Sequence, residues 1–300
     1  MCGIVGGTSE RNILPILVEG LRRLEYRGYD SAGVAFKKNG SISVTKNKGR
    51  VDQLAKKLNL KTNQSNLGIA HTRWATHGIP SEKNAHPHHS KNIFVVHNGI
   101  IENHNHLKAQ LKAEGIRFST QTDTEVVAHL IRMYTEKGQS FEKAVFNTIK
   151  KLKGAYALGI IDKNEPEQMI GVRNQSPLVL GKGFQENFIA SDVMALAPVT
   201  NKFVYLDDGQ VALLNHQKVV VKNTSNKIVR TKTHEVDSNA YTSDMAGYNH
   251  FMEKEIFEQP EAVKSSIEGR LTQSETQEGI FGAGFEDAVK DITNIQVVAC

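Results

Sequence analysis

Apolar residues in the first half of the chain follow two different periods. Spacings of three and four residues predict helices over 13–24, 103–114, 124–136 and 141–152, with Ser140 placed to cap the last one. Shorter apolar runs, separated by glycines, predict strands over 4–5, 31–36, 42–45, 67–72 and 93–97. This half of the chain therefore mixes both kinds of element.

From residue 155 onward the period is two. The alternation predicts short strands over 155–161, 169–172, 178–181, 188–190, 203–206, 211–214 and 219–222. Because strands and helices come in separate runs rather than in alternating units, the pattern predicts a layered α+β fold.

Composition shifts over 231–244, and helix patterns return over 250–269 and 285–291. The final apolar run, 295–300, is typical of a buried strand cut in the middle, whereas chain ends are more often polar and frayed. We therefore expect a main domain over 2–240, a second segment over 241–300, and a longer parent protein.

Composition excludes several classes of protein. With 39% hydrophobic and 23% charged residues in 300, the chain is neither disordered nor of low complexity. No apolar run approaches the ~18 residues that a membrane span needs, and the first residues lack the pattern of a secretory signal. Cys2 and Cys300 are the only cysteines, which excludes a disulfide scaffold and predicts a reducing cytoplasm.

The net charge of +5 is small for this length and is spread along the chain. The densest basic stretch, 46–57, is interpreted as a solvated loop and helix face. Nucleic-acid binding is not predicted, because it needs basic residues gathered on one patch or stripe.

Cys2 is the first candidate for chemistry. Removal of Met1 would leave a thiol, of reference pKa about 8.5, next to an α-amine of about 7.7–8.0. A terminal amine of that basicity can activate its own side chain as a nucleophile. A small buried residue at the start of a strand is the alternative, and on Cys2 alone that alternative is more frequent.

Eight of the twelve histidines lie between residues 71 and 106. A zinc site is conceivable, but the spacing of typical zinc ligands is missing and the stretch 85–89 is a proline-containing loop. We expect most of these histidines to orient loops, and we expect no bound metal and no cofactor.

Three further positions have both a structural and a chemical interpretation. Asn98-Gly99 after a strand is typical of a tight hairpin, yet its amide and backbone N–H also suit an oxyanion hole. Arg73 ends a strand and presents a fork that fits a carboxylate. Asp123 is either a first-turn helix carboxylate or a counter-charge for an ammonium group.

Four stretches together resemble the class II, N-terminal-nucleophile glutamine amidotransferases: 1–6, 71–78, 97–103 and 122–125. Within that class, 24–33 and 252–260 resemble the glutamine–fructose-6-phosphate aminotransferases, also called glucosamine-6-phosphate synthases. The resemblance covers essentially the whole chain and implies a four-layer αββα N-terminal-nucleophile hydrolase sandwich followed by a short helical segment.

The resemblance also implies roles for individual residues in hydrolysing L-glutamine. Cys2 would be the nucleophile with its own amine as base, and Asn98 and Gly99 would form the oxyanion hole. Arg73 would bind the α-carboxylate and Asp123 the α-ammonium group. The closing loop would contain Trp74, Thr76 and His77, and the supporting residues would be Arg27, Tyr29, His86 and His97.

In the full-length family the ammonia is transferred to fructose 6-phosphate by a sugar-isomerase half, through which the protein commonly forms a homodimer. Residues 241–300 would be only the first helical segment of that half. Three alternatives stay open: a sibling such as amidophosphoribosyltransferase or asparagine synthetase, a metal-dependent hydrolase built on the histidines, and a non-catalytic binding module.

Overall fold

The computed structural model describes residues 2–236, 248, 251–267, 290, 292–294 and 296. The chain divides into two compact units, Met1–Thr242 and Ser243–Cys300. In the second unit the helix predicted over 250–269 is present as α6 (Phe251–Ile267). The elements predicted over 285–291 and 295–300 lie almost entirely outside the described residues.

The larger sheet of the first unit has the strand order β14-β11-β9-β10-β1-β4-β2-β3, and every neighbouring pair is antiparallel. Its strands are β1 (Gly3–Ser9), β2 (Ser31–Lys38), β3 (Ser41–Lys48), β4 (Leu67–Arg73), β9 (Val179–Gly183), β10 (Glu186–Ala190), β11 (Lys202–Tyr205) and β14 (His234–Glu235). Gly3 pairs with Thr72, so the start of β1 lies beside the end of β4.

The smaller sheet has the order β13-β12-β8-β7-β6-β5 and is also antiparallel throughout. Its strands are β5 (His88–Ser90), β6 (Ile93–Gly99), β7 (Tyr156–Asp162), β8 (Met169–Asn174), β12 (Val211–Leu214) and β13 (Val219–Lys222).

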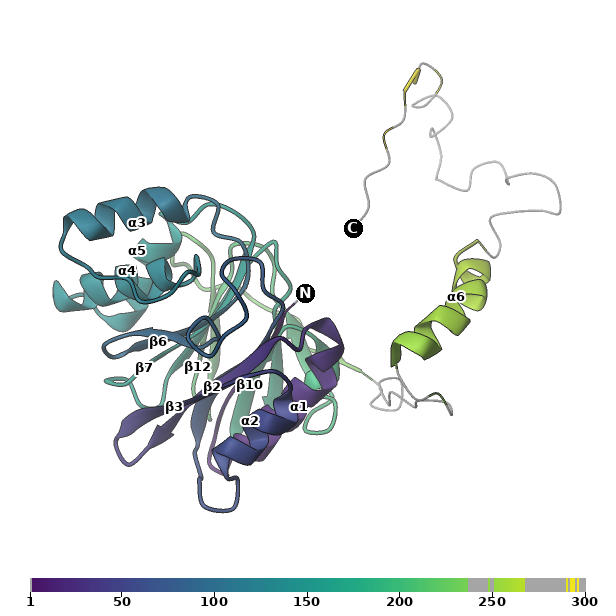
Figure 1. The fold of residues 1–300 in the computed structure, drawn as a ribbon, viewed down its shortest axis with the longest axis horizontal. Coiled ribbons are helices and arrows are strands. Elements are labelled where there is room, and N and C mark those ends of the chain that lie inside the picture. Colours follow the sequence, from purple (N-terminus) through teal and green to yellow (C-terminus); the bar gives the residue numbers. More distant parts are fainter. Residues whose placement is uncertain are drawn as a thin grey trace. The chain divides into compact units, whose positions relative to one another are not determined.

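Helices cover the outer face of each sheet (Figure 1). The larger sheet is covered by α1 (Leu14–Leu24) and α2 (Val51–Leu58), and the smaller by α3 (His104–Ala113), α4 (Glu125–Glu136) and α5 (Phe141–Ile149). Two short 3₁₀ helices, η1 (Glu25–Arg27) and η2 (Val193–Ala195), complete the unit. The α+β sandwich of four layers is therefore confirmed.

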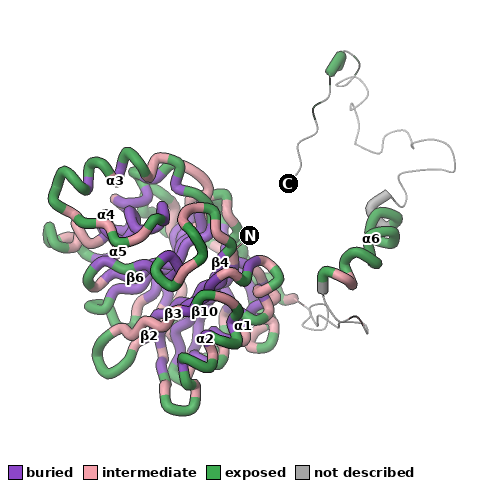
Figure 2. Tube along the Cα trace, viewed as in Figure 1, coloured by how far each residue is buried: buried purple, intermediate pink, exposed green. Residues whose placement is uncertain are grey.

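Three apolar cores separate these layers, and alternate residues of one strand enter different cores. In β4, Ile69 packs between the two sheets, whereas Ala70 faces α1 and α2. In β6, Val96 packs between the sheets, whereas Val95 faces the other helices. Figure 2 shows the central strands buried and much of the outer helix surface exposed.

The same alternation sets up the polar end of the layer between the sheets. His71 and Arg73 follow Ile69 at two-residue steps, and Asn98 follows Val96. These polar side chains therefore belong to the inter-sheet face at the ends of their strands.

Several predictions need correction. The stretch 85–89 is not wholly a loop, because β5 begins at His88. Lys46 is not fully solvated: it lies in β3 and burial lowers its pKa to about 8. Asn98-Gly99 forms no hairpin, since the chain leads from β6 to α3.

The predicted helix cap at Ser140 is confirmed, because the Ser140 hydroxyl accepts the N–H of Lys143 at 3.3 Å.

Within the described residues, none of the helices combines the length and the apolar character needed to cross a lipid bilayer.

Candidate active site

The thiol of Cys2 contacts the backbone of the segment that follows β4. The Trp74 N–H donates to Cys2 Sγ at 3.2 Å, and Sγ lies 3.4 Å from the Trp74 carbonyl oxygen. Burial raises the pKa of the thiol, while the Trp74 N–H and the Arg73 charge lower it by less. At neutral pH the thiol therefore carries its proton and needs a base to become a nucleophile.

Two cavities meet at Cys2. The larger, of about 280 Å³, is lined by Cys2, Arg27, Trp74, Thr76, Asn98, Gly99, Ile100, Ser176, Pro177 and Ser191. The smaller, of about 10 Å³, is lined by Cys2, Arg73, Trp74, Thr76, His77, His86, His97, Gly99, Thr122, Asp123 and Thr124. The thiol thus stands between a roomy cavity and a narrow one that contains an arginine and an aspartate.

Arg73 is 3% exposed, and its guanidinium is only partly hydrogen-bonded. Its Nη2 donates to the carbonyl oxygens of His77 and Gly78, the latter at 3.1 Å. Its Nη1 is buried and has no partner among the described residues. A buried donor of this kind costs free energy until an acceptor fills the cavity, so it marks a place for an anion.

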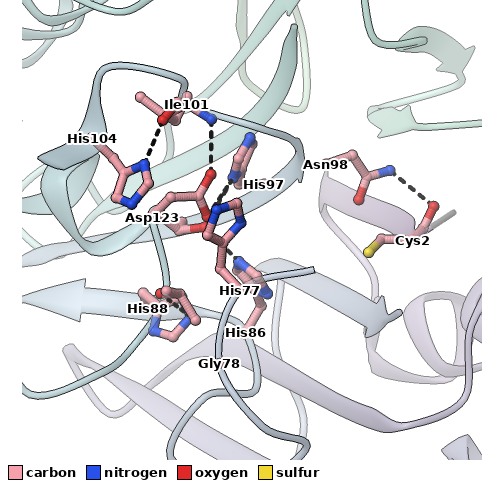
Figure 3. Close-up of polar contacts among 12 residues, drawn as sticks. Cys2, His77, Gly78, His86, His88, His97, Asn98, Ile101, His104 and Asp123 are labelled. Atoms are coloured by element: carbon pink, nitrogen blue, oxygen red, sulfur yellow. Dashed lines mark hydrogen bonds and ion pairs between the residues drawn. The ribbon is translucent and has the colours of Figure 1, made fainter. Parts of the chain in front are cut away.

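Asp123 does not cap α4, whose N-cap is Thr124. One oxygen, Oδ2, accepts the N–H of Ile101 at 2.8 Å, and Oδ1 lies 3.9 Å from His97 Nδ1 (Figure 3). Because burial lowers the pKa of His97, that ring is neutral at pH 7 and does not neutralise the carboxylate. The Asp123 side chain thus lies buried at the wall of the small cavity, with no charged partner in the neutral His97.

Asn98 and Gly99 end β6 on the other side of the thiol. The Asn98 Nδ2 donates to the Cys2 carbonyl oxygen at 3.0 Å, and Figure 3 shows this side chain directed at Cys2. The Ile100 N–H donates to the carbonyl oxygen of Ala155, the residue before β7. In an antiparallel pair of strands, alternate residues form the hydrogen bonds between the strands. The N–H of Gly99 therefore points away from β7.

Position 99 requires glycine for two reasons. Its φ is +115°, and a Cβ there would lie 2.0 Å from the carbonyl oxygen of Ala155. A larger residue would therefore displace the donors beside Cys2.

Two half-buried aspartates, Asp30 and Asp192, hold the segments around the thiol through hydrogen bonds and an ion pair. Asp30 accepts the N–H of Ala75 through one oxygen and the Ser31 hydroxyl through the other. The Arg27 guanidinium pairs with Asp192, which also accepts the N–H of Met194. Arg27 thereby becomes a fixed wall of the larger cavity.

The structure brings together all but one of the predicted site residues. Tyr29 lines neither cavity: it is 53% exposed, and the Arg50 guanidinium lies 5.7 Å from its ring centre. Sequence reasoning did not single out Asp30, Ser176 or Ser191. Asp30 lies inside the family-like stretch 24–33, whereas no local pattern marks the two serines.

The buried histidines bind one another and neighbouring hydroxyls. Thr124 Oγ1 lies 2.9 Å from both His86 Nε2 and His97 Nδ1, and the rings of His71 and His86 are 4.1 Å apart. Over the part of the chain that the structure describes, no group of three or more His, Cys, Asp or Glu side chains is suited to hold a metal ion.

With this geometry established, comparison with known proteins defines the class. Residues 57–250 match the glutamine amidotransferase domain, and the chain belongs to that family. It is 49% identical over 300 residues to the glutamine–fructose-6-phosphate aminotransferase (isomerizing) of Acinetobacter baylyi, and 46% identical over 301 residues to that of Shewanella oneidensis. Each alignment covers 100% of this chain but 49% of the relative, so the chain spans about half the length of these relatives.

Solved structures agree with the fold. The glutamine phosphoribosylpyrophosphate amidotransferase of B. subtilis superposes with a TM-score of 0.66 at 27% identity, covering 76% of this chain and 50% of that one. A structure described as the allosteric regulatory enzyme of purine biosynthesis gives 0.65 at 28%, with the same coverage. The predicted resemblance to the class II amidotransferases is confirmed, and the higher identity lies with the fructose-6-phosphate enzymes.

Proposed function

We propose that this chain hydrolyses L-glutamine to glutamate and ammonia, with the Cys2 thiol as nucleophile. The observation that carries the proposal is the convergence at Cys2 of an unpartnered arginine nitrogen, a buried carboxylate and an amide donor. An α-amino acid has an anion and a cation on one carbon, and Arg73 and Asp123 offer the matching charges.

Binding requires the small cavity to widen. Its volume of about 10 Å³ is no more than one water molecule needs, at about 10–15 Å³, so the α-carboxylate and α-ammonium groups of glutamine do not fit the present arrangement. Trp74, Thr76 and His77 line this cavity from one segment, and the Trp74 side chain is 54% exposed. We propose that this segment moves outward to admit glutamine and then closes over it.

The chemistry begins once Met1 has been removed. The α-amine of Cys2 accepts the thiol proton, and the thiolate attacks the side-chain amide carbon of glutamine. The carbonyl electron pair moves onto oxygen, where Asn98 Nδ2–H and Gly99 N–H stabilise the negative charge. The C–N bond then breaks, and the α-ammonium of Cys2 protonates the departing nitrogen as ammonia.

A γ-glutamyl thioester on Cys2 is left. Water adds to its carbonyl carbon, losing a proton to the α-amine, and the C–S bond breaks to release glutamate. The same two donors stabilise the second tetrahedral intermediate, because its oxygen occupies the same place.

In the whole protein we propose that ammonia is not released but transferred to fructose 6-phosphate, giving glucosamine 6-phosphate. Residues 241–300 would begin the sugar-isomerase half, which also would supply a homodimer interface. The fragment alone would release ammonia to water. We further propose a cytoplasmic protein, since two cysteines suit a reducing compartment, and no nucleic-acid partner.

The test is glutamate release from L-glutamine. Cys2→Ala should abolish it, whereas a chain with one residue added before Cys2, which blocks the amine, should lose nearly as much. Intact mass before and after a glutamine-like electrophile reports Met1 removal and thiol reactivity together. Turnover by Cys2→Ala at the unmodified rate would remove Cys2 from the mechanism, and loss with a chelator instead would favour a metal-dependent hydrolase.

A further inference from the structure

We propose that His71 is a positioning residue that fixes the Asn98 amide for oxyanion stabilisation. This inference rests on the function proposed above. His71 lies in β4 of the larger sheet and Asn98 in β6 of the smaller one, so the contact bridges the two sheets. His71 does not line either cavity at Cys2, and its effect on the reaction would pass through Asn98.

The hydrogen bonds define the tautomer of His71. Its Nε2 lies 3.0 Å from Asn98 Oδ1 and 3.0 Å from the carbonyl oxygen of His97. Both neighbours are acceptors, so Nε2 must carry the hydrogen and donate to them. The other ring nitrogen, Nδ1, is buried without a partner among the described residues.

The same bonds define the orientation of the amide. With Oδ1 toward His71, Nδ2 donates to the Cys2 carbonyl oxygen at 3.0 Å. Rotating the amide by 180° would place Oδ1 against that carbonyl, so two acceptors would meet. It would also require Nε2 of His71 to accept, and then Nε2 would face the acceptor of His97. His71 thus makes one of the two orientations strongly preferred.

Charge supports this role. His71 is fully buried, and burial lowers its pKa to about 3, so it is a neutral donor at every pH at which the enzyme would work. Nδ2 of Asn98 has two hydrogens, and one is used by Cys2. The second hydrogen then has a fixed direction and is available to the oxyanion of the proposed mechanism, in the cavity that Asn98 and Cys2 both line.

The place of His71 in β4 indicates a role other than packing. His71 occupies the inter-sheet face that Ile69 occupies two residues earlier, where an apolar side chain would fill the core without a polar atom to satisfy. A buried imidazole with one unpartnered nitrogen is the costlier choice for stability. Its single N–H is directed at a neighbour of the thiol.

The experiment compares His71→Gln, which keeps an N–H donor, with His71→Met, which has similar size and no donor. We expect His71→Met to lower kcat for glutamine hydrolysis by 10- to 100-fold with KM changed less than threefold. His71→Gln should stay within about fivefold of the unmodified chain. Alkylation of Cys2 by iodoacetamide, which needs no oxyanion hole, should proceed at the same rate in all three.

A double-mutant cycle separates positioning from general damage. In an Asn98→Ala background, His71→Met should cost less than twofold, because the amide through which it acts is gone. His129→Met is the matched control. His129 is also a buried histidine with polar partners, Ser90 and Glu125, but it lines neither cavity at Cys2. The kcat of the His129→Met variant should therefore equal that of the unmodified chain. Urea midpoints show which variants fold.

Two results would overturn the inference: a loss in His71→Met that persists in full without Asn98, or equal kcat in the Gln and Met variants. If His71→Met fails to fold, the His71→Gln and Asn98→Ala cycle still decides, since Gln should then show a small coupled loss. Failure of the proposed function is recognised separately, by glutamate release that survives Cys2→Ala.

Discussion

The two sides of Cys2 are built differently. On the Asn98 side, each end of the amide is hydrogen-bonded to a group in or next to a strand: Oδ1 to His71 in β4, and Nδ2 to the carbonyl oxygen of Cys2, which directly precedes β1. On the opposite side, Arg73 holds the carbonyl oxygens of His77 and Gly78, which belong to a segment outside the sheets. In the proposed mechanism, the groups next to the reacting carbon are thus fixed by strand register, whereas those that would bind the rest of glutamine depend on a loop.

The largest expected effect comes from breaking the strand-held side. Asn98→Ala should lower kcat for glutamine hydrolysis by 10²–10³-fold, about 2.7–4 kcal/mol, because one oxyanion donor is lost. KM for glutamine should change little, since Asn98 does not line the small cavity. Steady-state glutamate release measures both constants, and a rise in KM at constant kcat would place Asn98 in binding instead.

The loop side should respond in the opposite way. Arg73→Lys keeps the charge but loses the planar fork that can hold two carbonyls and a carboxylate together. We expect kcat/KM to fall roughly 10- to 100-fold, mostly through KM, from the loss of a charge-assisted pair of about 1.5–3 kcal/mol. Decarboxylated glutamine, which lacks the α-carboxylate, should be hydrolysed about equally by both proteins; an undiminished preference for glutamine in Arg73→Lys would contradict this role.

Acid should lower the free energy of unfolding, because the folded protein keeps buried histidines neutral. His88 is 1% exposed, and burial lowers its pKa well below the usual value, so the folded protein keeps it neutral. The unfolded chain binds a proton below about pH 6.5, so the free energy of unfolding falls as pH falls through that value, by up to about 1.4 kcal/mol per pH unit for each such histidine.

Urea unfolding at pH 7.5, 6.5 and 5.5 measures this dependence. His88→Gln should have a shallower loss between pH 6.5 and 5.5 than the unmodified chain. His106→Gln, at an exposed position of α3, should keep the original slope. Equal slopes in all three proteins would show that His88 already takes up its proton in the folded state.

The smallest effect tests whether stability alone changes turnover. Ser140→Ala removes the side-chain cap of α5, on the outer face of the smaller sheet, and should lower the free energy of unfolding by about 1 kcal/mol. Its kcat and KM should match those of the unmodified chain. A parallel drop in kcat would mean that global stability, rather than local geometry, contributes to the larger effects above.

Sequence patterns predicted the layers well because alternation and helical spacing depend on local burial. β5 and β14 escaped notice since two or three residues are too few to show a period. Arg73, Asn98 and Asp123 could be chosen as candidates because their residue types suit the chemistry and lie at or near element ends, although a hairpin or a helix cap was an equal explanation for Asn98 and Asp123. Their roles came from the family resemblance and stay predictions.

Contacts between segments that are distant in the sequence could not be predicted from it. His71 and Asn98 are 27 positions apart and meet only because two separate sheets face each other. Ser176 and Ser191 reach the cavity wall from another part of the chain, and no local feature distinguishes them from other serines. Which strands become neighbours depends on the packing of the whole unit rather than on any one stretch.

The alternation of β1 has a consequence for changes in chain length near its start. Ile4 faces the layer between the sheets, whereas a side chain at position 3 would lie 2.8 Å from Cβ of Leu24, against α1. Inserting or deleting one residue between Cys2 and Ile4 would therefore turn the sulfur toward α1 instead of toward the layer between the sheets. The proposed mechanism adds a second limit at this end, because an affinity tag there would have to be removed so that Cys2 becomes the first residue.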